Sequence, residues 1–480
     1  MHNIFKVLVK QTAFIYLTEI LSRLANFASA ILIVRYMGEA ALGEISYAAS
    51  LVFLFAVFTD LGYALISVKY FAQFGKEDKE VLNPGFTLKF ISSVAIFLIL
   101  LSYPVFVSIN SALSLLISLL ALDIVFSSFS FPYKYAFGGL RQFQYESILK
   151  IIIAAFSLAL LLILVQVYPN IAVVGGGIPL FCSLFSFLYF WRLNKKLNIV
   201  NAKLTFDIAK LTAFFKSCLP FSIGAVVVMF HQKIGIILLK EFSDFESVGV
   251  FIIAYKIIEA LNMIPNVILG ITFPVLSSFF VNWNEKAEKI VFILTKYLLI
   301  ISVPLALLVC FLGGDLLTLL INKPCGDCGG LLKILSWILV PSFLYSVTGG
   351  LINAGPRPGA NTTIHFFMTG LYCVMLAVFL PGWGLLGLAY SMVLVEWLAL
   401  LIRVIYIRKW IYKTGHIALL YKVFIAAGVS FIPLFMMNSY GAGIISLVLY
   451  LGILIISGFI TKEEVLVFYR IAGSYGREVA

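Results

Sequence analysis

The feature that most constrains this chain is the recurrence of long apolar runs over its whole length. Stretches such as 151–167 and 444–460 contain no charged residue, and about 20 apolar residues in a helix cross the hydrocarbon core of a bilayer. Hydrophobic residues make up 62% and charged residues 12% of the 480 positions. The mean hydropathy of +1.07 is far above that of soluble globular proteins. The chain is therefore predicted to be an integral membrane protein.

Apolar runs between turn or charge signals predict about 14 transmembrane helices. Glycine and proline punctuate several breaks, for example at 83–85 and 381–384. A membrane β-barrel is excluded, because its strands would alternate polar and apolar residues over short segments. We therefore expect an all-α fold. The predicted spans are 11–37, 45–71, 84–108, 112–133, 147–168, 171–193, 212–239, 247–279, 290–313, 331–353, 359–381, 384–407, 417–437 and 441–460.

The formal net charge of +12 indicates the orientation of the chain and not a nucleic-acid partner. Lys and Arg are concentrated in every second connection between spans, as the positive-inside rule expects for cytoplasmic connections. The first apolar segment contains Glu19 and Arg23 and is longer than the apolar region of a signal peptide, so we expect a retained helix. The protein is predicted to be a multi-pass protein of the cell membrane with both termini in the cytoplasm.

Two short segments recur at nearly the same offset and predict an internal duplication. Residues 35–43 resemble 240–249, and the glycine pair at 138–139 has a counterpart at 349–350. Each repeat holds six spans, so the two copies are expected to be parallel repeats about an axis along the membrane normal, with a central cavity between two lobes. The predicted domains are an N-lobe (1–193), a cytoplasmic linker (194–216), a C-lobe (217–408), and two further helices with a cytoplasmic tail (409–480).

Four segments, taken in their order and spacing, resemble a known family. They are Val34-Arg35-Tyr36-Met37-Gly38, Thr59-Asp60-Leu61-Gly62-Tyr63, Leu219-Pro220-Phe221 and Val248-Gly249-Val250-Phe251. Over essentially the full chain, the sequence is similar to the polysaccharide-exporter branch of the multidrug/oligosaccharidyl-lipid/polysaccharide superfamily, which includes O-antigen flippases.

The resemblance implies a fold like that of the multidrug (MATE) transporters and alternating access between two lobes. It also implies a polyprenyl-diphosphate-linked oligosaccharide as cargo, such as an O-antigen repeat unit of lipopolysaccharide, carried from the cytoplasmic to the outer leaflet. Membrane lipids are the surrounding partner, and other polysaccharide assembly proteins are left open as partners. Many relatives carry an acidic residue in the middle of the seventh span, where this chain has His231-Gln232-Lys233, so ion coupling at that position stays open.

Charged residues within the predicted spans are candidates for the substrate site, because a charge at the centre of a membrane helix costs about 2.5–3.5 kcal/mol. Arg23, Lys233 and Lys256 are predicted to line the cavity and bind the diphosphate, which attracts cations and accepts two hydrogen bonds from Arg. Asn26 shares a helical face with Arg23 and is included in the substrate site. Two alternatives remain: Arg23 and Lys256 can form structural ion pairs with neighbouring acids, and Lys233 can extend to an interface.

Glu19, Asp60, Glu259 and Glu396 are candidates for ion coupling or for structural pairing. No cofactor or metal site is predicted, and a proton or sodium gradient is left open as the energy source. The sequence has no G-x-x-x-x-G-K-[ST] motif for a nucleotide, and we expect a transporter and not an enzyme. Cys325 and Cys328 form a single C-x-x-C, for which a local disulfide and two free thiols both stay open.

Two rival functions remain. A drug or cation antiporter of the same fold would favour an acidic, aromatic-lined cavity, whereas this chain places cations in its spans. A membrane-bound polysaccharide polymerase or ligase would be expected to have a long outward loop with catalytic residues, whereas the outward connections here are short. Both alternatives are therefore less favoured than a flippase.

Overall fold

The computed structural model describes residues 2–60, 62–74, 79–107, 110–140, 142–197, 203–279, 285–357, 359–410, 421–437 and 440–459. Helices account for nearly all of these residues, and the described ranges contain no strand. The all-α prediction is confirmed.

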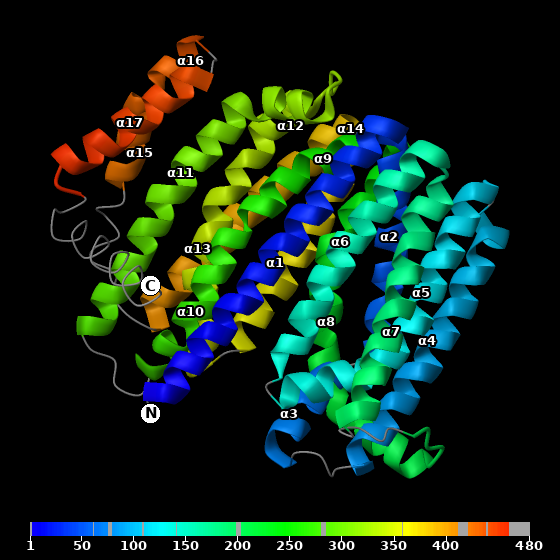
Figure 1. The fold of residues 1–480 in the computed structure, drawn as a ribbon. Coiled ribbons are helices and arrows are strands. Elements are labelled where there is room, and N and C mark those ends of the chain that lie inside the picture. The colour runs from blue at the N-terminus through cyan, green and yellow to red at the C-terminus, as the bar shows by residue number, and fades with distance from the viewer. Residues whose placement is uncertain are drawn as a thin grey trace. The chain divides into compact units, whose positions relative to one another are not determined.

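The helices are labelled in Figure 1 where there is room. In chain order they are α1 (His2–Met37), α2 (Glu39–Asp60), α3 (Tyr63–Phe74), α4 (Lys79–Val107), α5 (Ser111–Gly139), α6 (Phe143–Val167), the π-helical η1 (Val173–Gly177), α7 (Ile178–Leu197), α8 (Ile208–Phe242), α9 (Phe245–Leu261), α10 (Met263–Phe279), α11 (Glu285–Ile321), α12 (Cys328–Leu335), the 3₁₀ turn η2 (Ser336–Ile338), α13 (Leu339–Ala354), α14 (Gly359–Trp410), α15 (Tyr421–Ser430), α16 (Ile432–Met437) and α17 (Tyr440–Ile456).

Within the described residues, 10 helices are long and apolar enough to cross a membrane, or up to 11 if a bent pair within α8 forms one span. The predicted spans 359–381 and 384–407 both fall on α14, which is interrupted at Gly384 by a φ of 49°. Glycine adopts this left-handed conformation without the steric cost that a side chain would add. The helices at 422–434 and 440–456 are shorter than 18 residues. The number of fourteen spans therefore stays a prediction.

The chain forms two compact units, of which the first contains the sites discussed below. Unit 1 consists of Met1–Ala260, Leu320–Pro324 and His365–Ser391. Within it, α1 packs along α6, α4 and α7 pack on α5, and α2 packs against α8. The centre of its core is apolar, since Leu100, Leu116 and Ile117 are fully buried between α4 and α5. This packing brings α1, α5 and α6 together.

Unit 2 consists of Leu261–Leu319, Cys325–Ile364 and Met392–Ala480. Within it, α10 packs against α13, and α15 packs against α17. The Tyr450 hydroxyl of α17 donates to the carbonyl oxygen of Ile300 in α11 at 3.2 Å. These units divide the chain at other positions than the lobes predicted from the internal repeat, and the two-lobe arrangement stays a prediction.

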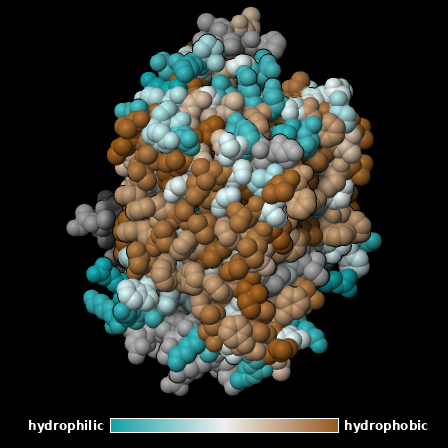
Figure 2. Space-filling model, turned by 90° about the vertical axis from the view of Figure 1, so that its right-hand side faces the viewer, coloured by the Kyte–Doolittle hydropathy of each residue, from teal (hydrophilic) through white to brown (hydrophobic). Residues whose placement is uncertain are grey.

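The surface carries many exposed apolar side chains. On the face drawn in Figure 2, hydrophobic residues cover the middle, and hydrophilic residues gather toward the upper and lower ends. Among the exposed apolar side chains, Phe106 of α4 is 83% and Val167 of α6 is 76% exposed. Exposed apolar surface on this scale fits contact with lipid and not with water.

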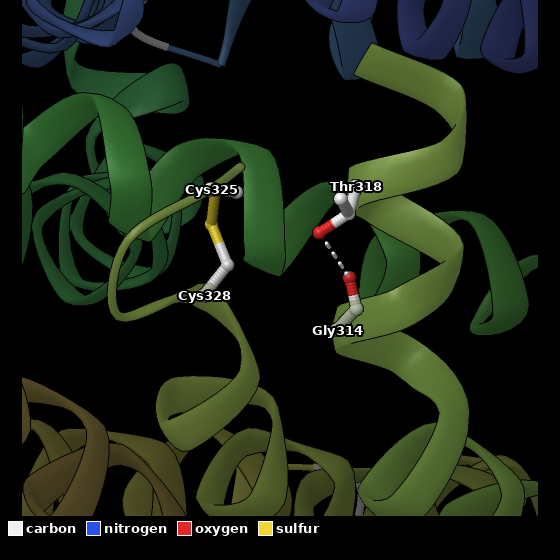
Figure 3. Close-up of a disulfide and its surroundings, with 4 residues drawn as sticks. All are labelled: Gly314, Thr318, Cys325 and Cys328. Carbon is white, nitrogen blue, oxygen red and sulfur yellow. Dashed lines mark hydrogen bonds between the residues drawn. A yellow bond between two sulfur atoms is a disulfide. The ribbon is translucent and has the colours of Figure 1, made fainter. Parts of the chain in front are cut away.

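A disulfide joins Cys325, in the connection between α11 and α12, to Cys328, the first residue of α12 (Figure 3). The sulfur link closes the turn that leads into α12, and both cysteines are buried. Nearby on α11, the Thr318 hydroxyl donates to the Gly314 carbonyl oxygen at 3.0 Å. The sequence had left a disulfide and two free thiols open, and the structure has the disulfide.

Candidate functional site

Five charged side chains from α1, α5 and α6 form a continuous set of ion pairs in unit 1. Arg23 donates from Nε to Glu19 Oε1 at 3.0 Å. Lys150 Nζ lies 3.6 Å from Glu19 Oε2 and 3.4 Å from Glu146 Oε1. Lys134 Nζ lies 3.3 Å from the same Glu146 oxygen. We call Glu19, Arg23, Lys134, Glu146 and Lys150 the inner charge cluster.

Helical spacing and helix packing together produce this cluster. Glu19 and Arg23 are four residues apart on α1, and Glu146 and Lys150 are four residues apart on α6, so each pair shares a helical face. The packing of α1 along α6 then places Lys150 beside Glu19. These side chains are between 22% and 40% exposed. Contact between charged groups and acyl chains is unfavourable in free energy. We therefore expect this face of unit 1 to be in contact with water.

A second ion pair joins α2 to α4. Lys89 Nζ lies 3.3 Å from Asp60 Oδ1 and 3.4 Å from the centre of the Phe131 ring, and Lys89 is only 2% exposed. The adjoining pocket, which Tyr63 and Cys218 help to line, has a volume of ≈ 10 Å³, which is room for about one water molecule. This pocket is too small for a phosphate or a sugar.

A third group of charges lies on α8 and α9, also in unit 1. Lys256 donates from Nζ to Glu259 Oε2 at 2.7 Å. Lys233 of α8 is half-buried, lies within electrostatic range of both of these groups, and has its Nζ 5.7 Å from the centre of the Phe53 ring. We call Lys233, Lys256 and Glu259 the outer charge cluster.

The structure thus places most of the predicted site residues in these groups. Arg23 and Glu19 belong to the inner charge cluster, and the exposed Asn26 follows them on α1. Lys233, Lys256 and Glu259 belong to the outer charge cluster. That the two charge clusters line one common cavity stays a prediction.

Glu396 is a predicted site residue that belongs to unit 2. It is half-buried on α14 and lies within electrostatic range of the buried Arg403. The Arg403 guanidinium also lies 4.4 Å from the centre of the Tyr345 ring and donates to Asn361 Oδ1 at 3.4 Å. This environment fits the structural role that the sequence left open for Glu396.

Several charged residues of these groups are absent from the sequence-based site. Lys89 interrupts the apolar sequence of the predicted span 84–108. This interruption could have indicated that its side chain is buried inside the protein. Glu146 and Lys150 have the spacing of a helical ion pair at the start of another span. Lys134 lies just beyond the predicted span 112–133, whereas the structure has it within α5.

His231, in the seventh predicted span, faces α14. Its Nδ1 lies 3.3 Å from Thr369 Oγ1, and its ring centre lies 4.8 Å from that of Tyr372. In the part of the chain that the structure describes, no group of three or more His, Cys, Asp or Glu side chains is placed to hold a metal ion.

The fold is that of a class of polytopic membrane protein that is known from solved transporter structures. The structure of "Lipid II flippase MurJ, inward closed conformation" has a TM-score of 0.75 at 15% identity, over 94% of this chain and 99% of that one. An inward-facing multidrug resistance MATE family transporter of the MOP superfamily has a TM-score of 0.62 at 15% identity, over 81% and 94% of the two chains. These similarities show the fold.

The family follows from the sequence itself. Residues 8–280 match the family described as "Polysaccharide biosynthesis protein", and the chain belongs to this family. The capsular polysaccharide biosynthesis protein CapF of Staphylococcus aureus is 25% identical over 410 residues, which are 82% of this chain and 98% of CapF. The resemblance found in the sequence is confirmed.

Proposed function

We propose that this protein is a flippase that carries a polyprenyl-diphosphate-linked oligosaccharide from the cytoplasmic to the outer leaflet by alternating access. Membership of a polysaccharide biosynthesis family and a fold shared with a lipid II flippase support a lipid-linked sugar as cargo. The observation that carries the proposal is the outer charge cluster, in which two cations and one carboxylate lie on apolar helices of unit 1.

The chemistry of such a cargo explains why cations are needed. A diphosphate between a lipid tail and a sugar is the part that resists transfer through hydrocarbon most strongly, because isolated charges are costly to remove from water. Cations in a medium of low dielectric constant offset this cost, since electrostatic attraction strengthens as water is excluded. In the proposed mechanism, Lys233, Lys256 and Arg23 contact the diphosphate while the polyprenyl chain stays in the bilayer.

The proposed orientation places the substrate entrance on the cytoplasmic side. Basic residues occupy the connections that the sequence assigns to the cytoplasm, while the Cys325–Cys328 disulfide lies in a connection assigned to the outside. Disulfides persist in oxidising compartments, so both observations support the same topology. The energy source is proposed to be a proton or sodium gradient acting on carboxylates such as Asp60 or Glu259.

A proteoliposome assay with a fluorescent polyprenyl-diphosphate sugar tests the proposal. Lys233→Ala and Arg23→Ala are each expected to slow translocation about tenfold or more, as loss of one charge-assisted contact predicts. Lys196→Ala, which removes an exposed charge at the end of α7, is the matched control and should retain the wild-type rate. Wild-type protein that translocates no such substrate, but expels organic cations, would show the rival antiporter function.

A further inference from the structure

We propose that the inner charge cluster is a separate docking station for the diphosphate group of the lipid-linked substrate, occupied from the cytoplasmic side before the group reaches the outer charge cluster. This inference rests on the flippase function proposed above. It adds Lys134 and Lys150 as substrate-binding residues and predicts two stations at different depths.

The depths follow from the positions of the residues along their helices. Lys233 and Lys256 lie 9 and 11 residues from the outward ends of α8 and α9, which is about 14–17 Å at a rise of about 1.5 Å per residue. Arg23 and Lys150 lie 14 and 17 residues from the outward ends of α1 and α6, which is about 21–26 Å. Since the hydrocarbon core is about 30 Å thick, the outer charge cluster is near mid-depth and the inner charge cluster is in the cytoplasmic half.

The charge balance of the inner charge cluster leaves it positive. Three cations face two carboxylates, which leaves one excess positive charge, whereas the neighbouring Lys89 is paired with Asp60 and adds no net charge. Arg23 uses Nε for its bond to Glu19, so its two terminal nitrogens lie outside that bond. Guanidinium nitrogens in this arrangement suit a phosphate oxygen. The excess positive charge of the cluster attracts an anion such as a diphosphate.

The exposure of the cluster indicates access for a ligand. An ion-pair set that only joins helices is expected to be enclosed by their packing, as Lys89 is. Lys134 and Lys150 are instead 40% and 39% exposed, although α1 and α6 are closely packed. Arg23 and Lys150, which are 33% and 39% exposed within the cytoplasmic half of the hydrocarbon core, are not stable against acyl chains. They therefore face a water-filled entrance that a phosphorylated head group can also enter.

A structural role and a binding role of the cluster predict opposite effects of Glu146→Gln on diphosphate binding. If the ion pairs only join helices, Glu146→Gln weakens the cluster and lowers both stability and any ligand binding. If the cluster is a docking station, Glu146→Gln removes a competing negative charge and strengthens binding of a diphosphate. Lys150→Ala removes a cation and weakens binding. The pair of variants therefore separates a binding role from a structural one.

The experiment measures binding of farnesyl diphosphate, a short polyprenyl diphosphate, to the full-length protein in detergent. Farnesol and inorganic pyrophosphate are the comparison probes, which separate the lipid tail from the free phosphate as the source of binding. Lys150→Ala is expected to raise the Kd about tenfold and Glu146→Gln to lower it about threefold, on the scale of charge-assisted contacts. Lys196→Ala should leave the Kd unchanged, and the melting temperature of each variant controls for folding.

Lys233→Ala provides the second half of the test. With two stations, this variant keeps farnesyl diphosphate binding close to wild type while it loses translocation in proteoliposomes. Equal loss of binding in Lys233→Ala and Lys150→Ala would overturn the two-station proposal, as would a wild-type Kd in Lys150→Ala. Either result would leave the flippase function standing if translocation of the lipid-linked sugar persists. Absence of translocation by the wild type would refute the function even if the diphosphate binds to the inner charge cluster.

Discussion

Gly43 of α2 and Gly249 of α9 lie in a reciprocal backbone contact within unit 1. A Cβ atom on Gly43 would overlap the carbonyl oxygen of Phe245, and a Cβ atom on Gly249 would overlap the carbonyl oxygen of Glu39. Phe245 precedes Gly249 by four residues, and Glu39 precedes Gly43 by four residues. Such reciprocity is the pattern of a contact across a two-fold axis. The two glycines also end the recurring segments of the sequence, which supports the duplication.

Alanine at Gly43 is expected to destabilise the protein by about 1–3 kcal/mol, because its methyl group forces the backbones of α2 and α9 apart. Gly370→Ala is the matched control in the same unit, since a Cβ at Gly370 meets no atom within 4 Å. Thermal unfolding in detergent measures both variants. Equal melting temperatures for the two variants would contradict the close contact.

The same substitution is expected to open the outward ends of α2 and α9. Val248, which is fully buried beside Gly249, provides a reporter as Val248→Cys. A membrane-impermeant maleimide should label this cysteine faster when Gly43→Ala is present, because the helix ends no longer close on each other. An unchanged labelling rate would show that the contact does not control access to this end of the helices.

Asp244 is expected to stabilise the start of α9 as its N-cap. Its Oδ1 accepts a hydrogen bond from the Ser247 backbone N–H at 2.8 Å. Asp244→Ala should cost about 1 kcal/mol, whereas Asp244→Asn should cost much less because Asn also caps helices well. Urea or thermal unfolding of the two variants measures this difference. A similar loss in both variants would mean that the charge and not the cap stabilises the helix.

The Ser247 hydrogen bond also predicts how pH acts at this cap. It lowers the pKa of the Asp244 carboxyl, so the folded state favours the ionised form. The contribution is fully present above the pKa of the unfolded chain, about 3.9 for Asp, and is lost as the pH falls through the lower pKa of the folded state. The stability of wild type relative to Asp244→Asn should therefore decrease as the pH falls from about 5 to about 3, across the unfolded-state pKa of Asp. A constant difference would contradict this assignment.

Asp60 is expected to stabilise the charge of the buried Lys89. Asp60→Asn should destabilise the protein by about 2 kcal/mol, because it leaves an ammonium group in an apolar site with a weaker partner. The double variant Asp60→Asn/Lys89→Met removes the buried charge as well and should recover much of this loss. Thermal unfolding of the two single variants and the double variant forms a complete cycle. Additive losses would show that the two side chains do not interact.

The proposed topology predicts which side of the membrane each helix end reaches. Tyr168 follows α6 on the outward side, and Lys195 lies at the cytoplasmic end of α7 by this topology; both are exposed. In a variant without the four free cysteines, an impermeant maleimide applied to intact cells should label Tyr168→Cys and not Lys195→Cys. Labelling in the opposite pattern would invert the topology and place the disulfide in the cytoplasm.

Sequence reasoning predicted the features of the site that depend on local geometry. Glu19 with Arg23, and Lys256 with Glu259, are one helical turn apart, so their pairing follows from helix geometry alone. The contacts of Lys150 with Glu19 and of Lys89 with Asp60 join different helices. They depend on which faces of those helices meet, and the spacing of residues in one chain does not contain that information.

The sequence by itself determined that this chain is a bundle of membrane helices, because apolar runs long enough to cross a bilayer have few other stable structures. It also determined the family, through short motifs in a characteristic order. Only the tertiary structure decided which charges meet. It brings α1, α5 and α6 together at the inner charge cluster, and it packs Gly43 of α2 against the backbone of α9. The physical reason is that hydrophobicity drives a helix into the membrane without specifying its neighbours, whereas ion pairs and close backbone contacts require particular helix faces to pack together.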